Sequence, residues 1–545
     1  MQTYREKEAV ARTFFKWDGR SGKAAGKDSR KTAPRGAACG WPARVRSFAL
    51  PAPGAGYPLS GLSFFVGIKR FFGNISFVVL LNLLVKPGWV VVENLVQDRL
   101  GHATFGLVTA LSALTLVVAA LSDLGLTPYA VQRVAAEPRF MAETFPTLLP
   151  LRGALNFVAL AAMLVLGAVL GYRGTELLLL GAVGTALLLA QYGQFLRGTL
   201  QAHQKFNTDA VLSVLEKFVL LGAVLALLPL GLTLPNYVGA RLGAAAFTAV
   251  LTYGLMTRLF GRVRYRWQGP VARTALRASL PFALMTLLYG VNERIDMLML
   301  ERLASPTEAG YYAGAYRWVD AVMMYAWTVL PLFFAKFASV PKDAGAQRQL
   351  LMFGQRVVAL PLLFVVAFVL FRGEVVFWQF KHSTPAEVAR MTLCLKILFL
   401  NVLVHAFFAI YSTLLTSTTH ERAVSWLVAL SIALNIGLNL FLLPHYGAVA
   451  ASLNTLLCAV AVSGGYLVLV ARRTGVGVPF RLLARLLLAF GLLCGVWYGL
   501  QYGLYLRWWV EAGIMAGVFA LIVLGTGLVQ RKEMGGLLPG RGGKG

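Results

Sequence analysis

Apolar windows long enough to cross a bilayer recur along most of this 545-residue chain, and no other feature of the sequence constrains the fold as strongly. A hydrocarbon core of about 30 Å takes roughly 20 apolar residues per helix. In lipid, every backbone N–H and C=O group must be hydrogen-bonded within the protein, so spanning segments are helices or closed barrels. We therefore predict an all-α polytopic membrane protein with about fourteen transmembrane helices.

The breaks between these windows divide the predicted helices into groups. We predict a basic disordered tail at 1–65, six-helix lobes at 66–265 and 266–475, a C-terminal helix pair at 476–530, and a basic glycine-rich tail at 531–545. The predicted spans lie near 72–96, 104–127, 146–171, 175–201, 209–231, 236–260, 274–303, 309–338, 350–372, 387–416, 421–443, 447–471, 481–503 and 507–529.

Basic residues give the chain a formal net charge of +28, and they gather in the tails and in alternate loops. The loop after the sixth span, for example, holds six arginines between Arg258 and Arg277, whereas the loops on the opposite side carry little net positive charge. The positive-inside rule then predicts both termini in the cytoplasm, for a multi-pass protein that we expect in the bacterial inner membrane. Because the charge follows the loops, we expect no nucleic-acid partner.

Motifs for soluble chemistry are missing from the sequence. It contains no P-loop, HExxH or GxSxG motif, and its four cysteines are widely spaced. We therefore predict no cofactor, no metal, no disulfide and no enzymatic activity.

The two predicted lobes carry a weak internal repeat. Residues 195–229 and 410–444 align without gaps and share a closing Leu-Leu-Pro and a polar hairpin between helices. In addition, DRLGHATFGL from Asp98 is similar to ERLASPTEAGYY from Glu301. Since both members of each pair lie at the same depth and on the same side, the repeat has parallel topology, which favours a two-lobed transporter.

Ionisable residues inside predicted spans are the sharpest functional signal. A charge at mid-bilayer costs about 2.5–3.5 kcal/mol on insertion scales unless it faces protein or water. The seventh span contains Glu293, Arg294 and Asp296, and the eighth contains Arg317 and Asp320, so we predict a charge network between these two helices. The alternative is that the charges neutralise one another and hold helix packing. His405 in the tenth span titrates in a range suited to proton coupling, although a single histidine in a helix is more often structural.

Three segments resemble a known family: QDRLGHATFGLVTALSALTLVVAALSDLGLTPYAVQR from Gln97, QFLRGTLQAHQKFNTDAVLSVLEK from Gln194, and ASLPFALMTLLYGVNERIDMLMLERL from Ala278. The chain is similar here, and over about residues 65–530, to the polysaccharide flippases of the multidrug, oligosaccharidyl-lipid and polysaccharide exporter superfamily. The resemblance implies outward flipping of an undecaprenyl-pyrophosphate-linked oligosaccharide by alternating access, for cell-surface polysaccharide biosynthesis.

The resemblance also suggests site residues and partners. The related lipid II flippases bind pyrophosphate with cavity arginines, and by that analogy Arg152, Arg294 and Arg317 are the candidate substrate-binding residues. Glu293, Asp296 and Asp320 are the candidates for ion coupling. Expected partners are the lipid-linked oligosaccharide, membrane lipid, and a polysaccharide polymerase or glycosyltransferases. Two alternatives stay open, namely a cation-coupled multidrug exporter of the same superfamily and a non-transporting scaffold of a glycan-assembly complex.

Overall fold

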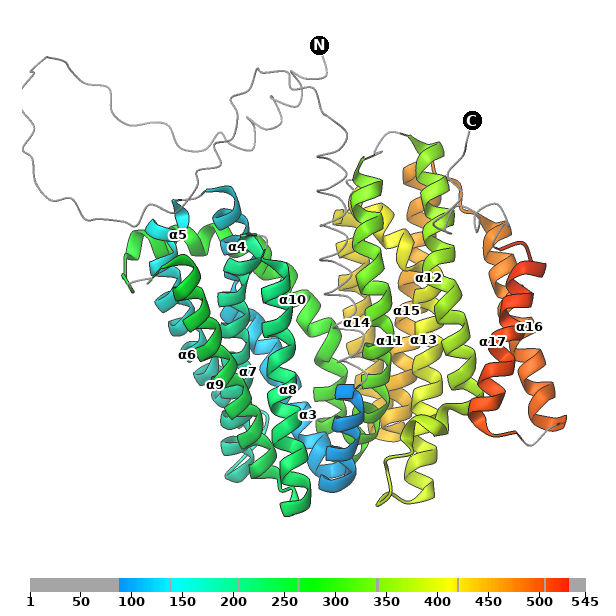
Figure 1. Ribbon diagram of the computed structural model, residues 1–545, viewed down its shortest axis with the longest axis horizontal. Helices are drawn as coiled ribbons and strands as arrows, with labels where there is room; N and C mark the ends of the chain where they lie inside the picture. Colours follow the sequence, from blue (N-terminus) through cyan, green and yellow to red (C-terminus); the bar gives the residue numbers. More distant parts are fainter. Residues whose placement is uncertain are drawn as a thin grey trace, which may run out of the picture. The chain divides into compact units, whose positions relative to one another are not determined.

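The computed structural model describes residues 88–528 except 138, 204, 262–264, 340–342, 419–420 and 504–505, and within these ranges every regular element is a helix (Figure 1). Residues 88–100 are helical. The labelled helices that follow are α3 (His102–Asp123), α4 (Leu126–Ala136), α5 (Phe140–Glu143), α6 (Phe145–Val169), α7 (Thr175–Ala202), α8 (Phe206–Gly231), α9 (Leu234–Phe260), α10 (Gly269–Leu303), α11 (Pro306–Ser339), α12 (Ala344–Arg372), η1 (Gly373–Phe377), α13 (Pro385–Ser417), α14 (Glu421–Tyr446), α15 (Ala448–Leu469), η2 (Val470–Thr474), α16 (Phe480–Gly503) and α17 (Trp508–Gly525).

These helices confirm the prediction of an all-α polytopic membrane protein. Twelve helices within the described ranges are long and apolar enough to cross a membrane, and α10, at 35 residues, is a further long helix. Helices occupy thirteen of the fourteen predicted spans, and the span near 72–96 is described only from residue 88. Both predicted tails lie outside the described residues, and the lobe boundaries stay predictions.

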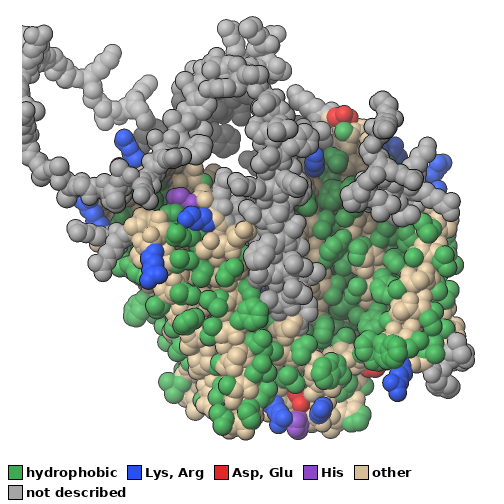
Figure 2. Space-filling model, in the orientation of Figure 1, with side chains coloured by type: hydrophobic (Ala, Val, Ile, Leu, Met, Phe, Trp, Pro, Cys, Tyr) green, Lys and Arg blue, Asp and Glu red, His purple; other side chains and the backbone are tan. Residues whose placement is uncertain are grey.

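Large apolar side chains cover the outer surface of the helices. Phe157, Leu230, Trp426 and Phe441 are among the most exposed, and each would face water in a soluble protein. On the face drawn in Figure 2, hydrophobic side chains fill a broad middle band, with Lys and Arg near its upper and lower margins. This arrangement suits a bilayer, in which apolar side chains face lipid and charged ones reach the aqueous boundary.

The hairpins of the sequence repeat break at matching positions. α7 ends at Ala202 and α13 ends at Ser417, which are partners in the alignment, and the starts of α8 and α14, Phe206 and Glu421, are partners too. In each repeat, the first helix of the hairpin, α7 or α13, packs against most of the helices around it. α7 packs against α3, α4, α6, α8 and α9, whereas α13 packs against α11, α12, α14 and α15.

α10 and α3 join these groups (Figure 1). α10 packs against α3, α4 and α6 and also against α11, α14 and α15, while α3 packs against α11. The last pair, α16 and α17, packs against α12. A buried carboxylate fixes that pair, because Glu511 of α17 forms an ion pair with Arg372 of α12 at 2.5 Å and accepts a hydrogen bond from the Trp497 indole of α16.

Glycines allow α3 and α11 to cross at backbone contact. A Cβ atom added at Gly310 of α11 would collide with the carbonyl oxygen of His102, and one added at Gly106 of α3 would collide with that of Pro306. The amide Nε2 of Gln97 donates to the Gly310 carbonyl at 2.8 Å, which adds a polar contact at the crossing. Close packing at small residues is the usual way that membrane helices associate tightly.

Candidate functional site

A cavity of about 470 Å³ lies among α10, α11, α13, α14 and α15. Its volume falls in the range of small-molecule pockets, roughly 300–1,000 Å³. It extends from Asp296 and Thr455, in the interior of α10 and α15, to Thr416, one residue from the end of α13. Under the predicted topology, that end faces the cytoplasm. The cavity therefore lies within the predicted C-terminal lobe and not between the two lobes.

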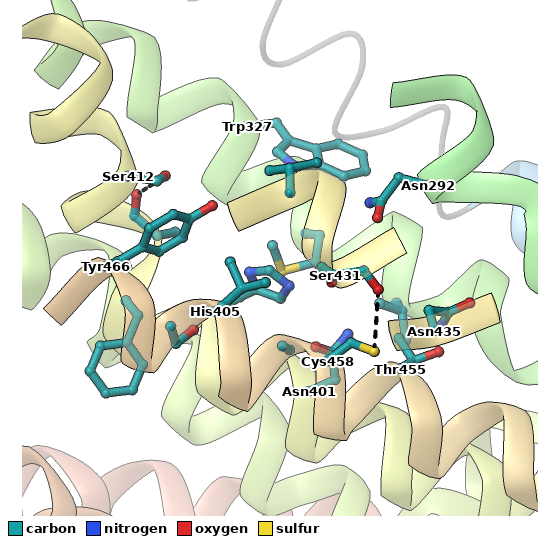
Figure 3. A pocket seen from close by; sticks show the side chains of 18 of the residues that line it. Asn292, Trp327, Asn401, His405, Ser412, Ser431, Asn435, Thr455, Cys458 and Tyr466 are labelled. Atoms are coloured by element: carbon teal, nitrogen blue, oxygen red, sulfur yellow. Dashed lines mark hydrogen bonds between the residues drawn. The ribbon is translucent and has the colours of Figure 1, made fainter. Parts of the chain in front are cut away.

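Polar side chains from α13 form one wall of the cavity. Asn401, His405, Ser412 and Thr416 line it at spacings of four, seven and four residues. Such spacings place them on one face of a helix with 3.6 residues per turn. In Figure 3, His405 lies in the middle of the pocket, with Asn435 and Thr455 toward one end and Tyr466 and Ser412 toward the other.

One ion pair of the predicted charge network between the seventh and eighth spans lies at the edge of this cavity. Arg294 of α10 and Asp320 of α11 both line it, and Nη2 of the arginine lies 3.7 Å from Oδ2 of the carboxylate. Their side chains are 30% and 36% exposed. A long, half-exposed ion pair of this kind contributes little to stability, about 0–1 kcal/mol.

Asp296 has a more enclosed position in the same cavity. Its Oδ1 accepts a hydrogen bond from Asn439 Nδ2 at 2.6 Å, and the hydroxyls of Tyr312 and Thr455 lie 3.4 and 3.2 Å from its Oδ2. Asn439 also donates to Asn435 Oδ1 at 2.9 Å. This cluster links α10, α11, α14 and α15 by side-chain contacts in the membrane interior, where polar groups require partners. The side chain of Glu293, the remaining ion-coupling candidate, lies outside the described residues.

Arg317 points away from the cavity into a buried seam between α11 and the helical segment 88–100. Its side chain donates to Asn94 Oδ1 at 2.9 Å, to Gln97 Oε1 at 2.5 Å and to the Ala313 carbonyl at 3.2 Å. The guanidinium also lies 4.7 Å from the ring centroid of Phe105. With only 8% of its surface exposed, Arg317 is held by protein groups on several sides.

The seam continues toward the loop before α13 through a chain of oriented hydrogen bonds. Because Arg317 donates to Gln97 Oε1, the amide Nε2 of Gln97 donates to His102 Nδ1 at 2.9 Å. The other ring nitrogen of His102 then carries the proton and donates to Ser383 Oγ at 2.9 Å. Beside it, His382 contacts Asp98, whose Oδ2 lies 2.7 Å from His382 Nδ1.

The repeated carboxylates Asp98 and Glu301 are both buried at this end of the helices. Glu301 accepts a hydrogen bond from the Tyr172 hydroxyl at 2.6 Å and pairs with Arg302 at 2.7 Å. Burial, followed by the hydrogen bond to Glu301, raises the pKa of Tyr172 well above its usual range. The phenol therefore stays protonated and keeps donating.

Arg152 lies in α6, among the helices of the predicted N-terminal lobe. Its Nη1 is 3.0 Å from Asp123 Oδ1, and its side chain is only 1% exposed. Its Nη2 donates weakly to Gln191 at 3.5 Å. The structure therefore does not bring the three predicted substrate-binding arginines together, because only Arg294 lines the cavity. A substrate role for Arg152 and Arg317 stays a prediction.

Sequence reasoning missed most of the uncharged polar lining. It singled out His405 but favoured a structural role, and it passed over Asn401, Ser412 and Asn435. The signal was present, since polar residues recur on one face of otherwise apolar helices. Charged residues drew attention because their insertion cost is larger.

Comparisons with known proteins agree with this architecture. Residues 71–334 match a family described as "Polysaccharide biosynthesis protein". An uncharacterized membrane protein of Methanocaldococcus jannaschii is 22% identical over 407 residues, which cover 71% of this chain and 94% of that protein.

Solved structures share the fold at low sequence identity. The lipid II flippase MurJ, in an inward closed conformation, gives a TM-score of 0.66 at 11% identity and covers 84% of this chain and 99% of its own. An inward-facing multidrug resistance MATE family transporter of the MOP superfamily gives a TM-score of 0.55 at 16% identity, and the match covers 72% of this chain and 96% of that chain. A MOP superfamily transporter from Pyrococcus furiosus gives a TM-score of 0.51 at 16% identity, and the match covers 72% of this chain and 93% of that chain.

The chain therefore shares its fold with these solved membrane transporters and carries a polar cavity among its membrane helices. Over residues 71–334 the chain is also similar to the polysaccharide biosynthesis family.

Proposed function

We propose that this protein translocates an undecaprenyl-pyrophosphate-linked oligosaccharide from the cytoplasmic to the outer leaflet of the bacterial inner membrane, for cell-surface polysaccharide biosynthesis. The observation that carries the proposal is a polar cavity among membrane-spanning helices, with Arg294 at its edge, in a chain that matches a polysaccharide biosynthesis family over residues 71–334. The lipid tail stays in the bilayer, so the protein has to shield only the phosphates and the sugar hydroxyls during transit.

Arg294 is the phosphate ligand in this proposal. A guanidinium binds phosphate through two parallel N–H···O bonds, which a loose contact with one carboxylate does not match. A pyrophosphate oxygen would therefore replace Asp320 at 3.7 Å. An inside-negative potential favours outward movement of the diphosphate by about 2.3 kcal/mol per charge per 100 mV.

Alternating access would open the seam around Arg317. The two halves meet there through hydrogen bonds among Arg317, Asn94 and Gln97 and between His102 and Ser383. Hydrogen bonds of this kind can be exchanged for bonds to water, so the seam could open without leaving these groups unpartnered. Under the predicted topology the seam lies toward the outer face.

Ion coupling belongs to the same proposal. Asp296, beside the amide groups of Asn439 and Asn435 and the hydroxyl of Thr455, offers a carboxylate with neutral oxygen donors. Such a group can exchange a proton or a sodium ion as the helices move. Stepwise replacement of the sodium gradient by a proton gradient across protein-containing vesicles would identify the ion.

A cation-coupled multidrug exporter is the second candidate, and one observation favours it. Two carboxylates, Asp296 and Asp320, line the cavity beside a single arginine, and acidic linings suit cationic drugs.

Vesicles that contain the purified protein separate these functions. We expect faster flipping of a fluorescent polyprenyl-pyrophosphate-linked trisaccharide than in protein-free vesicles, measured as label that becomes accessible to dithionite. We also expect no protection of a drug-sensitised host against cationic dyes. Dye export without glycolipid flipping would favour the exporter and overturn the proposal.

A further inference from the structure

The cavity wall formed by α13 presents hydrogen-bond acceptors and few spare donors. Ser412 Oγ donates to the Ala409 carbonyl at 2.8 Å, and Thr416 Oγ1 donates to the Ser412 carbonyl at 2.9 Å. Thr413 Oγ1 likewise donates to the Ala409 carbonyl at 3.2 Å. A hydroxyl has one proton and two lone pairs, so these oxygens can only accept from a ligand. The wall therefore suits a ligand that supplies donors.

Asn401 gives an independent sign that a ligand is expected. Its side chain is 5% exposed, it lines the cavity, and within the described part of the chain its Oδ1 has no hydrogen-bond partner. Buried polar atoms in proteins almost always have a partner, so an exception of this kind calls for an explanation. One helical turn further on, His405 projects into the middle of the pocket (Figure 3).

Both carboxylates that line the cavity already have partners among the described residues. Asp320 lies beside Arg294, and the Asp296 carboxylate is surrounded by Asn439, Tyr312 and Thr455. Aromatic rings are present as well, since Trp327 and Tyr466 border the pocket (Figure 3). The apolar face of a sugar ring packs well against such rings, while its hydroxyls supply the donors that the α13 wall lacks.

We propose that this cavity is a subsite for an uncharged, hydroxyl-rich sugar of the head group, with Asn401 and His405 as its hydrogen-bonding residues. The subsite is separate from the phosphate position at Arg294, and it rests on the proposed function. The volume of about 470 Å³ limits it to a short part of the glycan. Specificity would then reside in α13, whereas the diphosphate common to all such lipids is bound at α10.

Two lipids that differ only in the sugar test this separation. The probes are a fluorescent polyprenyl pyrophosphate without sugar and the same lipid carrying a neutral disaccharide, each assayed for binding to purified Asn401→Leu and His405→Phe protein. We expect binding of the glycosylated probe to fall about tenfold, the size of one or two lost hydrogen bonds, while binding of the bare probe stays unchanged. Thr392→Val is the matched control, because Thr392 lies on α13 outside the cavity and its hydroxyl donates within the helix.

If the variants lose binding of both probes equally, or lose binding of neither probe, the proposed sugar subsite is overturned. The proposed function fails separately, if the wild-type protein binds both probes but flips neither of them across the membrane.

Thiol protection gives a second test that needs no binding-site variant. Cys458 lines the cavity, and its Sγ lies 3.8 Å from the Ser431 carbonyl oxygen (Figure 3). We expect the glycosylated probe to slow labelling of Cys458 by a small thiosulfonate at least threefold and the bare probe to have no such effect, with Cys458→Ser protein as background. Equal protection by the two probes would contradict the proposal.

Discussion

Arg317 and Arg294 lie on neighbouring helices, yet their surroundings differ in every respect that decides function. Arg317 is 8% exposed and donates to Asn94, Gln97 and the Ala313 carbonyl. Arg294 is 30% exposed, borders the cavity and lies 3.7 Å from Asp320. The first arginine would have to lose several hydrogen bonds before it could bind a substrate.

The difference teaches that an arginine within the membrane can have either of two roles. When neutral amides and carbonyls surround it, the guanidinium fastens helices together, and its removal leaves buried acceptors without donors. When it faces a cavity beside a half-exposed carboxylate, the guanidinium can exchange that partner for a ligand. Substitutions in the two regions should therefore separate stability from transport.

The largest loss of stability is expected for Arg317→Ala. The substitution leaves Asn94 Oδ1 and Gln97 Oε1 buried without their donor, which should lower the free energy of unfolding by about 2–4 kcal/mol. Lysine should not rescue, because one ammonium cannot reproduce the forked contacts. Thermal unfolding in detergent measures the loss of stability of both Arg317 variants. Arg133→Ala is the control, since that arginine is exposed and its ion pair is with Glu137 of the same helix end. Equal melting temperatures for both variants would refute a structural role for Arg317.

A smaller loss is expected for Gly310→Ala at the crossing of α3 and α11. The added Cβ would collide with the His102 carbonyl oxygen, and overpacking of this kind costs about 1–3 kcal/mol. The helices should separate and the seam should open, which thiol labelling of a Ser383→Cys reporter would detect. Gly437→Ala is the control, because no atom lies within 4 Å of a Cβ added there. A reporter that labels at the parental rate would show that the crossing tolerates the methyl group.

The smallest effect is expected for Asp320→Asn. Removal of this carboxylate takes away one competitor for Arg294, worth about 0.2–1 kcal/mol, so binding of polyprenyl pyrophosphate should tighten by up to about fivefold, with little change in melting temperature. Fluorescence titration of the purified protein measures the change. Weaker binding would mean that Asp320 orients Arg294 instead of competing for it.

The sequence predicted the helices well because apolar length and turn residues are local signals. It placed thirteen spans and the aligned hairpin breaks at Ala202 and Ser417. It missed α4 and α5, which follow a turn at Leu124 and Gly125, where φ is 41° and 72°. A backbone conformation of this kind in leucine has no clear sequence signature.

The site was predicted only in part, because helical spacing tells which residues share a face but not which helix that face meets. The Arg294–Asp320 pair followed from adjacent spans of the chain. Arg317, in contrast, contacts Asn94, which is more than 200 positions earlier in the sequence. Only the packing of α11 against the segment 88–100 and α3 shows that this arginine is enclosed.

Flipping by the Arg294→Ala protein is the most direct test of the account. In vesicles that contain equal amounts of folded protein, we expect the variant to flip polyprenyl-pyrophosphate-linked trisaccharide at least about tenfold more slowly than wild type, the loss expected when a charged hydrogen-bond donor to phosphate is removed. Its melting temperature should stay close to that of wild type. A wild-type flipping rate in Arg294→Ala vesicles would contradict the claim that this arginine, at the cavity edge, binds the substrate.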